Sequence, residues 1–275
     1  MRFYPEHETI WGYKKRIEFL LSQIQSRYGK ERVSILDVGC GNGSMMSLPL
    51  AEQGYTVTGI DLDEHSIQKA RETNPFHNAT FLVAKTKDLL GNQYDVVICS
   101  EVLEHIEDYE PVILDLRRLC KPEGIVFITV PNGYGPFEID SFLAKRLKQL
   151  SVPEKIRQPI SRWIRSKHKQ AGVASTENIE CPHVHFFTMK HIRQSIERYF
   201  EITRVEKSVF ACGPLMTMLF GKRQWFVEWN LKLADKLPPA FVSGWYFSCK
   251  PKRDEAQEKI WQENKKKQPL CEIAS

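Results

Sequence analysis

The sequence predicts an α/β fold built on a doubly wound, mostly parallel sheet. Three observations carry this prediction. Short apolar runs alternate with helical patterns between residues 33 and 132, the connections between them are short, and a glycine-rich turn follows the first run. Strands buried on both faces show continuous apolar runs, and residues 94–100 (YDVVICS) and 124–130 (GIVFITV) fit that description.

The expected elements start with an amphipathic helix over 8–28 and continue as alternating strands and helices. The strands are expected at 33–38, 55–60, 80–84, 94–100 and 124–130, and the helices at 44–53, 63–73 and 110–119. Beyond residue 132 the pattern predicts a helix capped by Thr188 over 188–199, and strands at 200–208 and 244–250. The expected organisation is a helical lead-in at 1–30, one domain at 31–252 with insertions at 134–185 and 210–242, and a charged tail at 253–275.

Composition narrows the class of protein. A net charge of +5 over 275 residues is mild and does not by itself indicate a nucleic-acid binder. No apolar stretch approaches 18 residues, so we expect neither a secretion signal nor a membrane span. Seven scattered cysteines without a C-x-x-C pair favour buried free thiols in a cytoplasmic protein over a zinc site.

Residues 36–44 read LDVGCGNGS and carry the clearest chemical signal. Glycines at 39, 41 and 43 allow a ligand to approach the backbone closely. The dinucleotide fingerprint needs its third small residue one position beyond Gly43, where Ser44 stands, and it usually lacks an acid at the position of Asp37. A carboxylate there indicates a cationic amine on the ligand, which favours S-adenosylmethionine over NAD.

Residues 33–132 resemble the core of the class I S-adenosylmethionine-dependent methyltransferases. The resemblance rests on four segments in the family's order: 37–43 (DVGCGNG), 59–63 (GIDLD), 94–105 (YDVVICSEVLEH) and 119–124 (LCKPEG). The E-V-x-E-H run is similar to that of the ubiquinone-type O-methyltransferases. The resemblance implies a Rossmann-like sheet of seven strands with an antiparallel last strand, together with helical lid insertions.

The resemblance also implies a set of cofactor-binding residues, among which Asp61 would take both ribose hydroxyls. The acid that many relatives use for the adenine amine is replaced by Lys85, so we expect backbone and Thr86 or Lys87 to hold adenine, with Asp88 as an alternative. The expected cofactor residues are Asp37, Gly39, Cys40, Gly41, Asp61, Leu62, Thr86, Lys87, Ser100 and Glu101.

Methyl transfer to a hydroxyl needs a base near the methyl group, and histidine is the natural candidate. His105 follows the fourth strand, and His185 lies with His183 where the first insertion returns to the core. We expect His105 and His185 to be catalytic, although both can also be structural. We assign no metal, but Glu101, Glu104 and His105 could together hold Mg²⁺.

The insertions bear on the methyl acceptor. Residues 141–170 carry nine Lys/Arg and one Glu interleaved with apolar residues, which suits a solvated lid, a peripheral membrane contact or an anionic acceptor such as a lipid-linked glycan. Residues 209–229 are rich in Met and aromatic residues that suit an acceptor pocket, an interfacial loop or a core.

These observations predict a cytoplasmic S-adenosylmethionine-dependent methyltransferase acting on a hydroxyl oxygen of a small-molecule or lipid/glycan-linked acceptor. The run that amino-directed DNA methyltransferases use after strand 4, Asn/Asp-Pro-Pro-Tyr/Phe, is replaced here by Ser100-Glu101-Val102-Leu103, which argues against nucleic acid. The alternative is a protein that binds the cofactor without transferring methyl groups, as a scaffold or sensor. An NAD-dependent oxidoreductase is a third reading.

Overall fold

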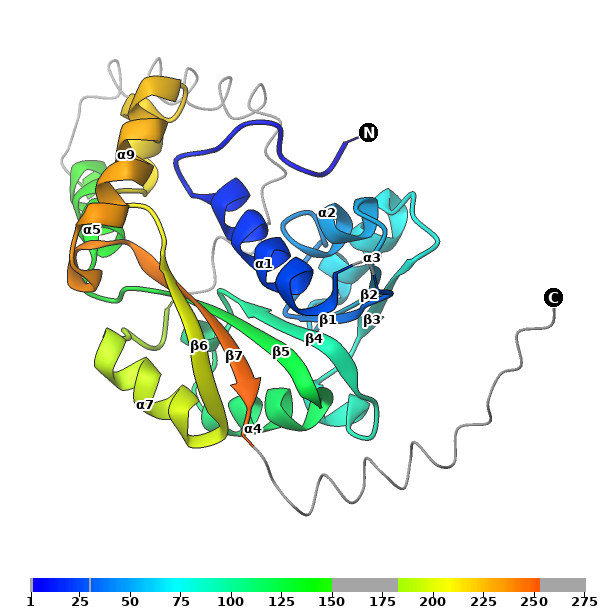
Figure 1. Cartoon of the computed structure of the whole chain (residues 1–275). Helices are drawn as coiled ribbons and strands as arrows, with labels where there is room; N and C mark the ends of the chain where they lie inside the picture. The colour runs from blue at the N-terminus through cyan, green and yellow to red at the C-terminus, as the bar shows by residue number, and fades with distance from the viewer. Residues whose placement is uncertain (1, 30, 150–182, 253–275) are drawn as a thin grey trace, which may run out of the picture.

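The computed structural model describes residues 2–29, 31–149 and 183–252, which form a seven-stranded sheet with helices on both faces (Figure 1). The strands are β1 (Ser34–Val38), β2 (Thr56–Asp61), β3 (Ala79–Val83), β4 (Tyr94–Ser100), β5 (Cys120–Pro131), β6 (Phe200–Lys207) and β7 (Gly244–Pro251). The helices are α1 (Tyr13–Tyr28), α2 (Ser47–Glu52), α3 (Glu64–Thr73), α4 (Glu110–Leu119), α5 (Pro136–Gln149), α7 (Met189–Tyr199), α8 (Pro214–Phe220) and α9 (Gln224–Lys236), and the short 3₁₀ turns are η1 (Thr86–Leu89), η2 (Leu103–His105) and η4 (Pro239–Phe241).

The strand order is β3-β2-β1-β4-β5-β7-β6. Strands β1 to β5 pair in parallel, and β7 pairs antiparallel with both β5 and β6. The order reverses between β1 and β4, and in doubly wound folds ligands bind at that point, outside the carboxyl ends of the strands. The predicted α/β fold with a mostly parallel seven-stranded sheet and an antiparallel last strand is confirmed.

Two apolar layers cover the sheet. Helices α1, α2 and α3 bury residues such as Leu20, Leu48 and Ile67 against one face. Helices α4 and α7 bury Leu116 and Ile196 against the other. Because both faces are covered, β4 and β5 carry the continuous apolar runs that the sequence showed.

Several helix ends follow from local chemistry. The Asp63 carboxylate accepts the Ser66 N–H at 3.1 Å and begins α3, and the Thr188 hydroxyl caps α7 as expected, accepting the His191 N–H at 3.2 Å. Helix α1 begins later than the expected residue 8, because Gly12 takes φ +71° and interrupts the helix there. The expected helix over 44–53 shortens to α2, because the turn after the glycine loop, in which Asn42 Oδ1 accepts the Ser44 N–H at 3.1 Å, extends to Met46 at φ −132°.

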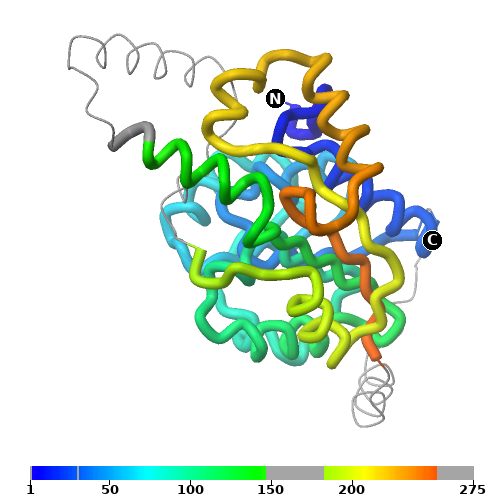
Figure 2. Tube along the Cα trace, turned by 90° about the vertical axis from the view of Figure 1, so that its left-hand side faces the viewer, coloured from blue at the N-terminus to red at the C-terminus, as the bar shows by residue number. Residues whose placement is uncertain are grey.

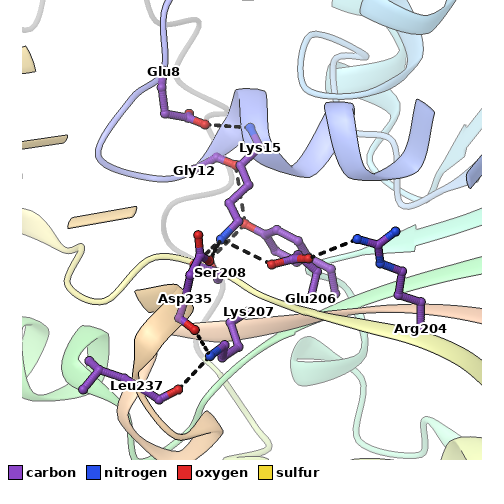
Figure 3. A network of polar contacts seen from close by, with 10 residues as sticks. Glu8, Gly12, Lys15, Arg204, Glu206, Lys207, Ser208, Asp235 and Leu237 are labelled. Carbon is purple, nitrogen blue, oxygen red and sulfur yellow. Dashed lines mark hydrogen bonds and ion pairs between the residues drawn. The ribbon is translucent and has the colours of Figure 1, made fainter. Parts of the chain in front are cut away.

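The start of α1 is held by the preceding residue Glu8 and by two distant elements of the chain. The Glu8 carboxylate accepts the backbone N–H groups of Lys14 and Lys15 at 3.0 and 2.6 Å, which satisfies the first turn of α1. The Lys15 ammonium then contacts Asp235 of α9 at 2.6 Å and Glu206 of β6 at 3.5 Å (Figure 3). Helix α1 is thereby joined to α9 and β6.

The two regions expected as insertions, 134–185 and 210–242, contain helices α5, α8 and α9, which lie at one end of the sheet (Figure 1). The five cysteines in the described ranges are all buried and free, which agrees with the predicted thiols. None of the helices described is both long and apolar enough to cross a membrane. The expectations for most of 141–170 and for the tail at 253–275 lie outside the described residues.

Candidate active site

The glycine loop after β1 is held against the end of β2 by backbone hydrogen bonds. Gly39 N and Cys40 N donate to the Ile60 carbonyl at 2.8 and 3.0 Å. Gly39 has φ +71°, and the position of a Cβ at this residue lies 2.4 Å from Cγ2 of Val102. A side chain therefore cannot be added here without moving the loop after β4.

Asp61 connects the loop to β2 with its carboxylate. Its Oδ2 accepts the Gly41 N–H at 2.7 Å and its Oδ1 accepts the Asp63 N–H at 2.9 Å. Because a carboxylate oxygen can accept more than one hydrogen bond, Asp61 still has lone pairs for two ligand hydroxyls. This geometry is compatible with the expected ribose contact and adds a structural role to it.

Asp37 is buried beneath the loop, with 3% of its surface exposed. Its Oδ2 accepts the Ser47 hydroxyl at 2.5 Å. Burial raises the pKa of Asp37 to about 7, against the lowering effect of the Ser47 hydrogen bond and with a further contribution from Asp61. A cation brought next to this carboxyl would favour its ionised form, as the predicted contact with a ligand amine requires.

The other expected cofactor residues on this side have different surroundings. Cys40 is buried and its thiol points toward Gly59 and the core, so at this position only the backbone can face a ligand. Leu62 is 64% exposed at the end of β2. Thr86 donates its hydroxyl to Asp115 of α4 at 2.7 Å, and Lys87 is exposed. Asp88, the alternative for adenine, accepts the Lys85 N–H within its own turn.

Glu101 follows β4 and has φ +56°, the one positive φ at a non-glycine residue in the described ranges. Its Oε1 accepts the Thr129 hydroxyl at 2.7 Å and lies 3.4 Å from Nη2 of Arg16. Ser100 joins the same group, since its hydroxyl lies 2.9 Å from that of Thr129 and accepts from Arg16 at 3.1 Å. Such backbone strain persists where surrounding contacts enforce it, often at functional sites.

Arg16 contacts both of these residues and was not expected from the sequence. It comes from α1, is 8% exposed, and reaches the carboxyl ends of β4 and β5. Burial acts to lower its pKa, but Glu101 and Tyr246 outweigh that effect and keep the guanidinium charged. One signal was present in the sequence, because Arg16 lies on the helical stripe of Leu20 and Ile24, which are buried apolar positions of α1.

Two histidines from distant segments meet at the same edge of the sheet. The ring centroids of His105, after β4, and His183 lie 5.1 Å apart. His183 Nδ1 lies 2.9 Å from Oε1 of Glu138 on α5. If Nδ1–H donates to that carboxylate, the Nε2 atom carries the lone pair that can accept a proton. Glu138 was also missed, because the sequence gives no reason to pair α5 with residue 183.

His185 lies apart from this pair. Its Nε2 is 2.8 Å from the Glu107 carbonyl oxygen, and its ring packs on Tyr109 and Phe187. The backbone N–H groups of Val184 and His185 both donate to the Glu104 carbonyl. The structure therefore brings His105 together with His183, and His185 contributes to holding residues 183–187 against the loop after β4.

The magnesium hypothesis involved Glu101, Glu104 and His105, and the geometry groups other residues. In the part of the chain that is described, Glu104, His105 and His183 have ligand atoms within 4.8 Å of one another, whereas Glu101 contacts Arg16. Burial, together with the Glu101 charge, raises the pKa of Glu104 well above its ordinary value. This group offers two imidazoles and one buried carboxyl, whereas Mg²⁺ prefers a set of oxygen ligands.

Comparison with known proteins shows which family the chain is similar to. A family model described as a methyltransferase domain matches residues 11–202. A ubiquinone biosynthesis O-methyltransferase from Rickettsia canadensis is 39% identical over 121 residues, which are 42% of this chain and 51% of the relative. The corresponding protein from Rickettsia prowazekii is 38% identical over 122 residues, 42% of this chain and 48% of the relative. The chain thus matches about half the length of these curated relatives.

Solved structures share the fold at low sequence identity. Magnesium protoporphyrin IX methyltransferase from Synechocystis PCC 6803, with bound SAH, superposes with a TM-score of 0.52 at 17% identity, covering 88% of this chain and 84% of that one. This likeness supports the fold alone. The match of the family model spans more than half of the sequence, from α1 into β6, and on that basis the chain belongs to the methyltransferase domain family.

Proposed function

We propose that this protein transfers a methyl group from S-adenosylmethionine to a hydroxyl oxygen of a small-molecule acceptor. One observation carries the proposal: the glycine loop with Asp37 and Asp61 and the pair His105 and His183 occupy the same carboxyl edge of the sheet. Family membership and the similarity to ubiquinone biosynthesis O-methyltransferases support it.

The cofactor, when bound, supplies an electrophilic methyl group on a sulfonium centre. In this proposal Asp37 pairs in its ionised form with the cationic amine, and Asp61 accepts the ribose hydroxyls. Backbone around Gly39, Cys40 and Gly41 allows close approach. The remaining cofactor contacts are proposed for Leu62, Thr86, Lys87, Ser100 and Glu101.

The chain's own task is to place the acceptor oxygen in line with the methyl group and to remove its proton. We propose His105 as the base, with His183 beside it held in orientation by Glu138. The acceptor O–H proton passes to an imidazole nitrogen, the oxygen forms a bond to the methyl carbon, and the carbon–sulfur bond breaks with its electron pair going to sulfur. His185, our other candidate base, is here assigned to fastening residues 183–187.

The acceptor is proposed to be a small molecule that can be linked to a lipid or glycan. The supporting observation is the charge of residues 141–170, nine Lys/Arg against one Glu, which suits an anionic acceptor or a peripheral contact with a membrane surface on the cytoplasmic side. No feature of the described residues favours nucleic acid.

The test incubates the full chain with cofactor labelled in its methyl group and with a metabolite and lipid extract. We expect a labelled, alkali-stable ether product, and we expect His105→Ala to lower its rate of formation at least about tenfold with an unchanged cofactor dissociation constant. His77→Ala, at an exposed histidine, is the matched control. Cofactor binding at full occupancy with no labelled product would favour the scaffold or sensor instead.

A further inference from the structure

Helix α5 carries an exposed apolar stripe that ends in a cation. Ile139, Phe142 and Leu143 are 59%, 58% and 48% exposed, and Arg146 follows them at the next position of the same helical face. The Arg146 guanidinium lies 5.4 Å from the centroid of the Phe142 ring. The inner side of the same helix carries Glu138, which contacts His183.

The hairpin formed by α8 and α9 repeats this arrangement. Met218 and Leu219 are 45% and 52% exposed at the end of α8, and Trp225 and Trp229 are 61% and 47% exposed, one turn apart, on α9. The exposed lysines of α9 continue the tryptophan stripe at helical spacing, and two further cations occupy the turn between the helices. These residues are Lys232 and Lys236, and Lys222 and Arg223.

The two sets of stripes belong to neighbouring elements. Both carboxylate oxygens of Asp140, on α5, accept N–H groups at the start of α8, from Leu215 at 2.8 Å and Met216 at 3.1 Å. Figure 2 shows α5 and the α8–α9 hairpin at the same end of the molecule. We call the exposed apolar and basic residues of these three helices the α5/α8–α9 surface.

The exposed charge of this surface is strongly one-sided. Among the residues of these helices and the α8–α9 turn whose side chains are described, six cations are exposed: Lys145, Arg146, Lys222, Arg223, Lys232 and Lys236. Of the acids, Glu138 pairs with His183, Asp140 caps α8 and Asp235 pairs with Lys15, which leaves Glu228. Tryptophans with neighbouring aliphatic side chains and a basic margin are typical of helices that lie in a membrane interface.

We propose that the α5/α8–α9 surface docks on an anionic phospholipid bilayer. The proposal rests on the peripheral membrane contact suggested for residues 141–170 and assigns it to described helices, including the second insertion. The apolar stripes enter the headgroup region and the cations contact lipid phosphates. Since α5 also carries Glu138, docking places the histidine pair next to acceptors held in the bilayer.

The test is co-sedimentation of the full chain with vesicles of phosphatidylcholine containing phosphatidylglycerol, and with vesicles of phosphatidylcholine alone. We expect binding to the anionic vesicles, weakened by salt, with a blue shift of tryptophan emission. Leu219→Glu should lower the vesicle partition at least about tenfold, because it places a carboxylate among the apolar side chains. Leu82→Glu, at an exposed leucine of the edge strand β3, should bind like wild type, and circular dichroism checks that both variants fold.

Equal partition of Leu219→Glu and wild type, or no binding of wild type to anionic vesicles, would overturn the proposal. A dimer in vesicle-free buffer that Leu219→Glu abolishes would instead assign the surface to a second copy of the chain. The assay is independent of the proposed chemistry: labelled product without vesicle binding contradicts docking alone, and vesicle binding without any labelled product contradicts methyl transfer alone.

Discussion

The two halves of the candidate active site are assembled in different ways. The cofactor half comes from the ends of β1 and β2, where Asp37, Gly39 and Asp61 lie within 25 residues of one another. The loop is joined to the end of β2 by backbone hydrogen bonds to Ile60 and by the Asp61 carboxylate. The acceptor half joins the loop after β4, Glu138 of α5 and His183, which are spread over most of the chain. Arg16 of α1 links it to the cofactor half, because it contacts Glu101, a proposed cofactor residue on that loop.

This difference explains why the cofactor half is easier to predict from the sequence than the acceptor half. Backbone requirements in the cofactor half, such as positive φ at Gly39, restrict the residue type and leave a visible pattern. The acceptor half depends on side chains that meet only in the folded state. Each of the following predictions tests whether the two halves behave as separate units, from the largest expected effect to the smallest.

Gly39→Ala should abolish measurable cofactor binding and destabilise the fold by about 3 kcal/mol. An alanine there adopts an unfavourable φ and its Cβ overlaps the Val102 side chain. Gly54→Ala is the matched control, because Gly54 also has positive φ (+92°) but has no atom within 4 Å of the added Cβ. Cofactor titration and urea unfolding measure both variants, and equal losses would show that only φ matters at the loop.

Arg16→Ala should destabilise the protein by about 2 kcal/mol, less than the loss of a fully buried ion pair, since Glu101 is partly exposed. The strained residue Glu101 then keeps only its Thr129 contacts, and the turnover of the labelled acceptor should fall more than cofactor affinity does. Arg193→Ala, which removes an exposed ion pair with Glu197, should change unfolding by less than about 0.5 kcal/mol. If Arg16→Ala lowers cofactor affinity as much as it lowers turnover, the two halves do not behave as separate units.

Cofactor affinity should rise about tenfold between pH 6 and pH 8, because Asp37 ionises with a pKa of about 7 and its carboxylate attracts the ligand amine. For the unliganded protein the sign is opposite. A carboxyl whose folded pKa lies above the ordinary 3.8 contributes stability at low pH that is lost as pH rises from about 4 to about 7. Asp37→Asn should flatten the pH dependence of both cofactor affinity and stability, each measured by calorimetry. If the pH dependence of affinity is unchanged in this variant, Asp37 does not contact the ligand amine.

Treatment with EDTA should leave turnover unchanged, since Glu104, His105 and His183 offer one carboxyl and two imidazoles, whereas Mg²⁺ prefers a set of oxygen ligands. The measurement compares the rate of labelled product formation before chelation, after it and after addition of Mg²⁺. If the rate is lost with EDTA and restored by Mg²⁺, the acceptor half contains a metal site.

Much of the fold was predictable because its signals are local. The apolar runs of β4 and β5 and the Thr188 cap of α7 were read correctly, since burial and capping restrict residue type directly. Element starts were less accurate where local backbone geometry decides them: positive φ at Gly12 moves the start of α1, and the turn through Met46 shortens α2.

By itself, the sequence determined the succession of strands and helices along the chain, the glycine loop, and the carboxylates Asp37 and Asp61. Each of these features is specified by residues that are close together in the chain. Only the tertiary structure decided that Arg16 reaches Glu101, that His105 meets His183 rather than His185, and that α5 lies beside α8. These contacts depend on how separate elements pack, and a charged or aromatic side chain has no local pattern that names its partner. The cofactor half of the site could therefore be predicted from local sequence, whereas the contacts of the acceptor half required the tertiary structure.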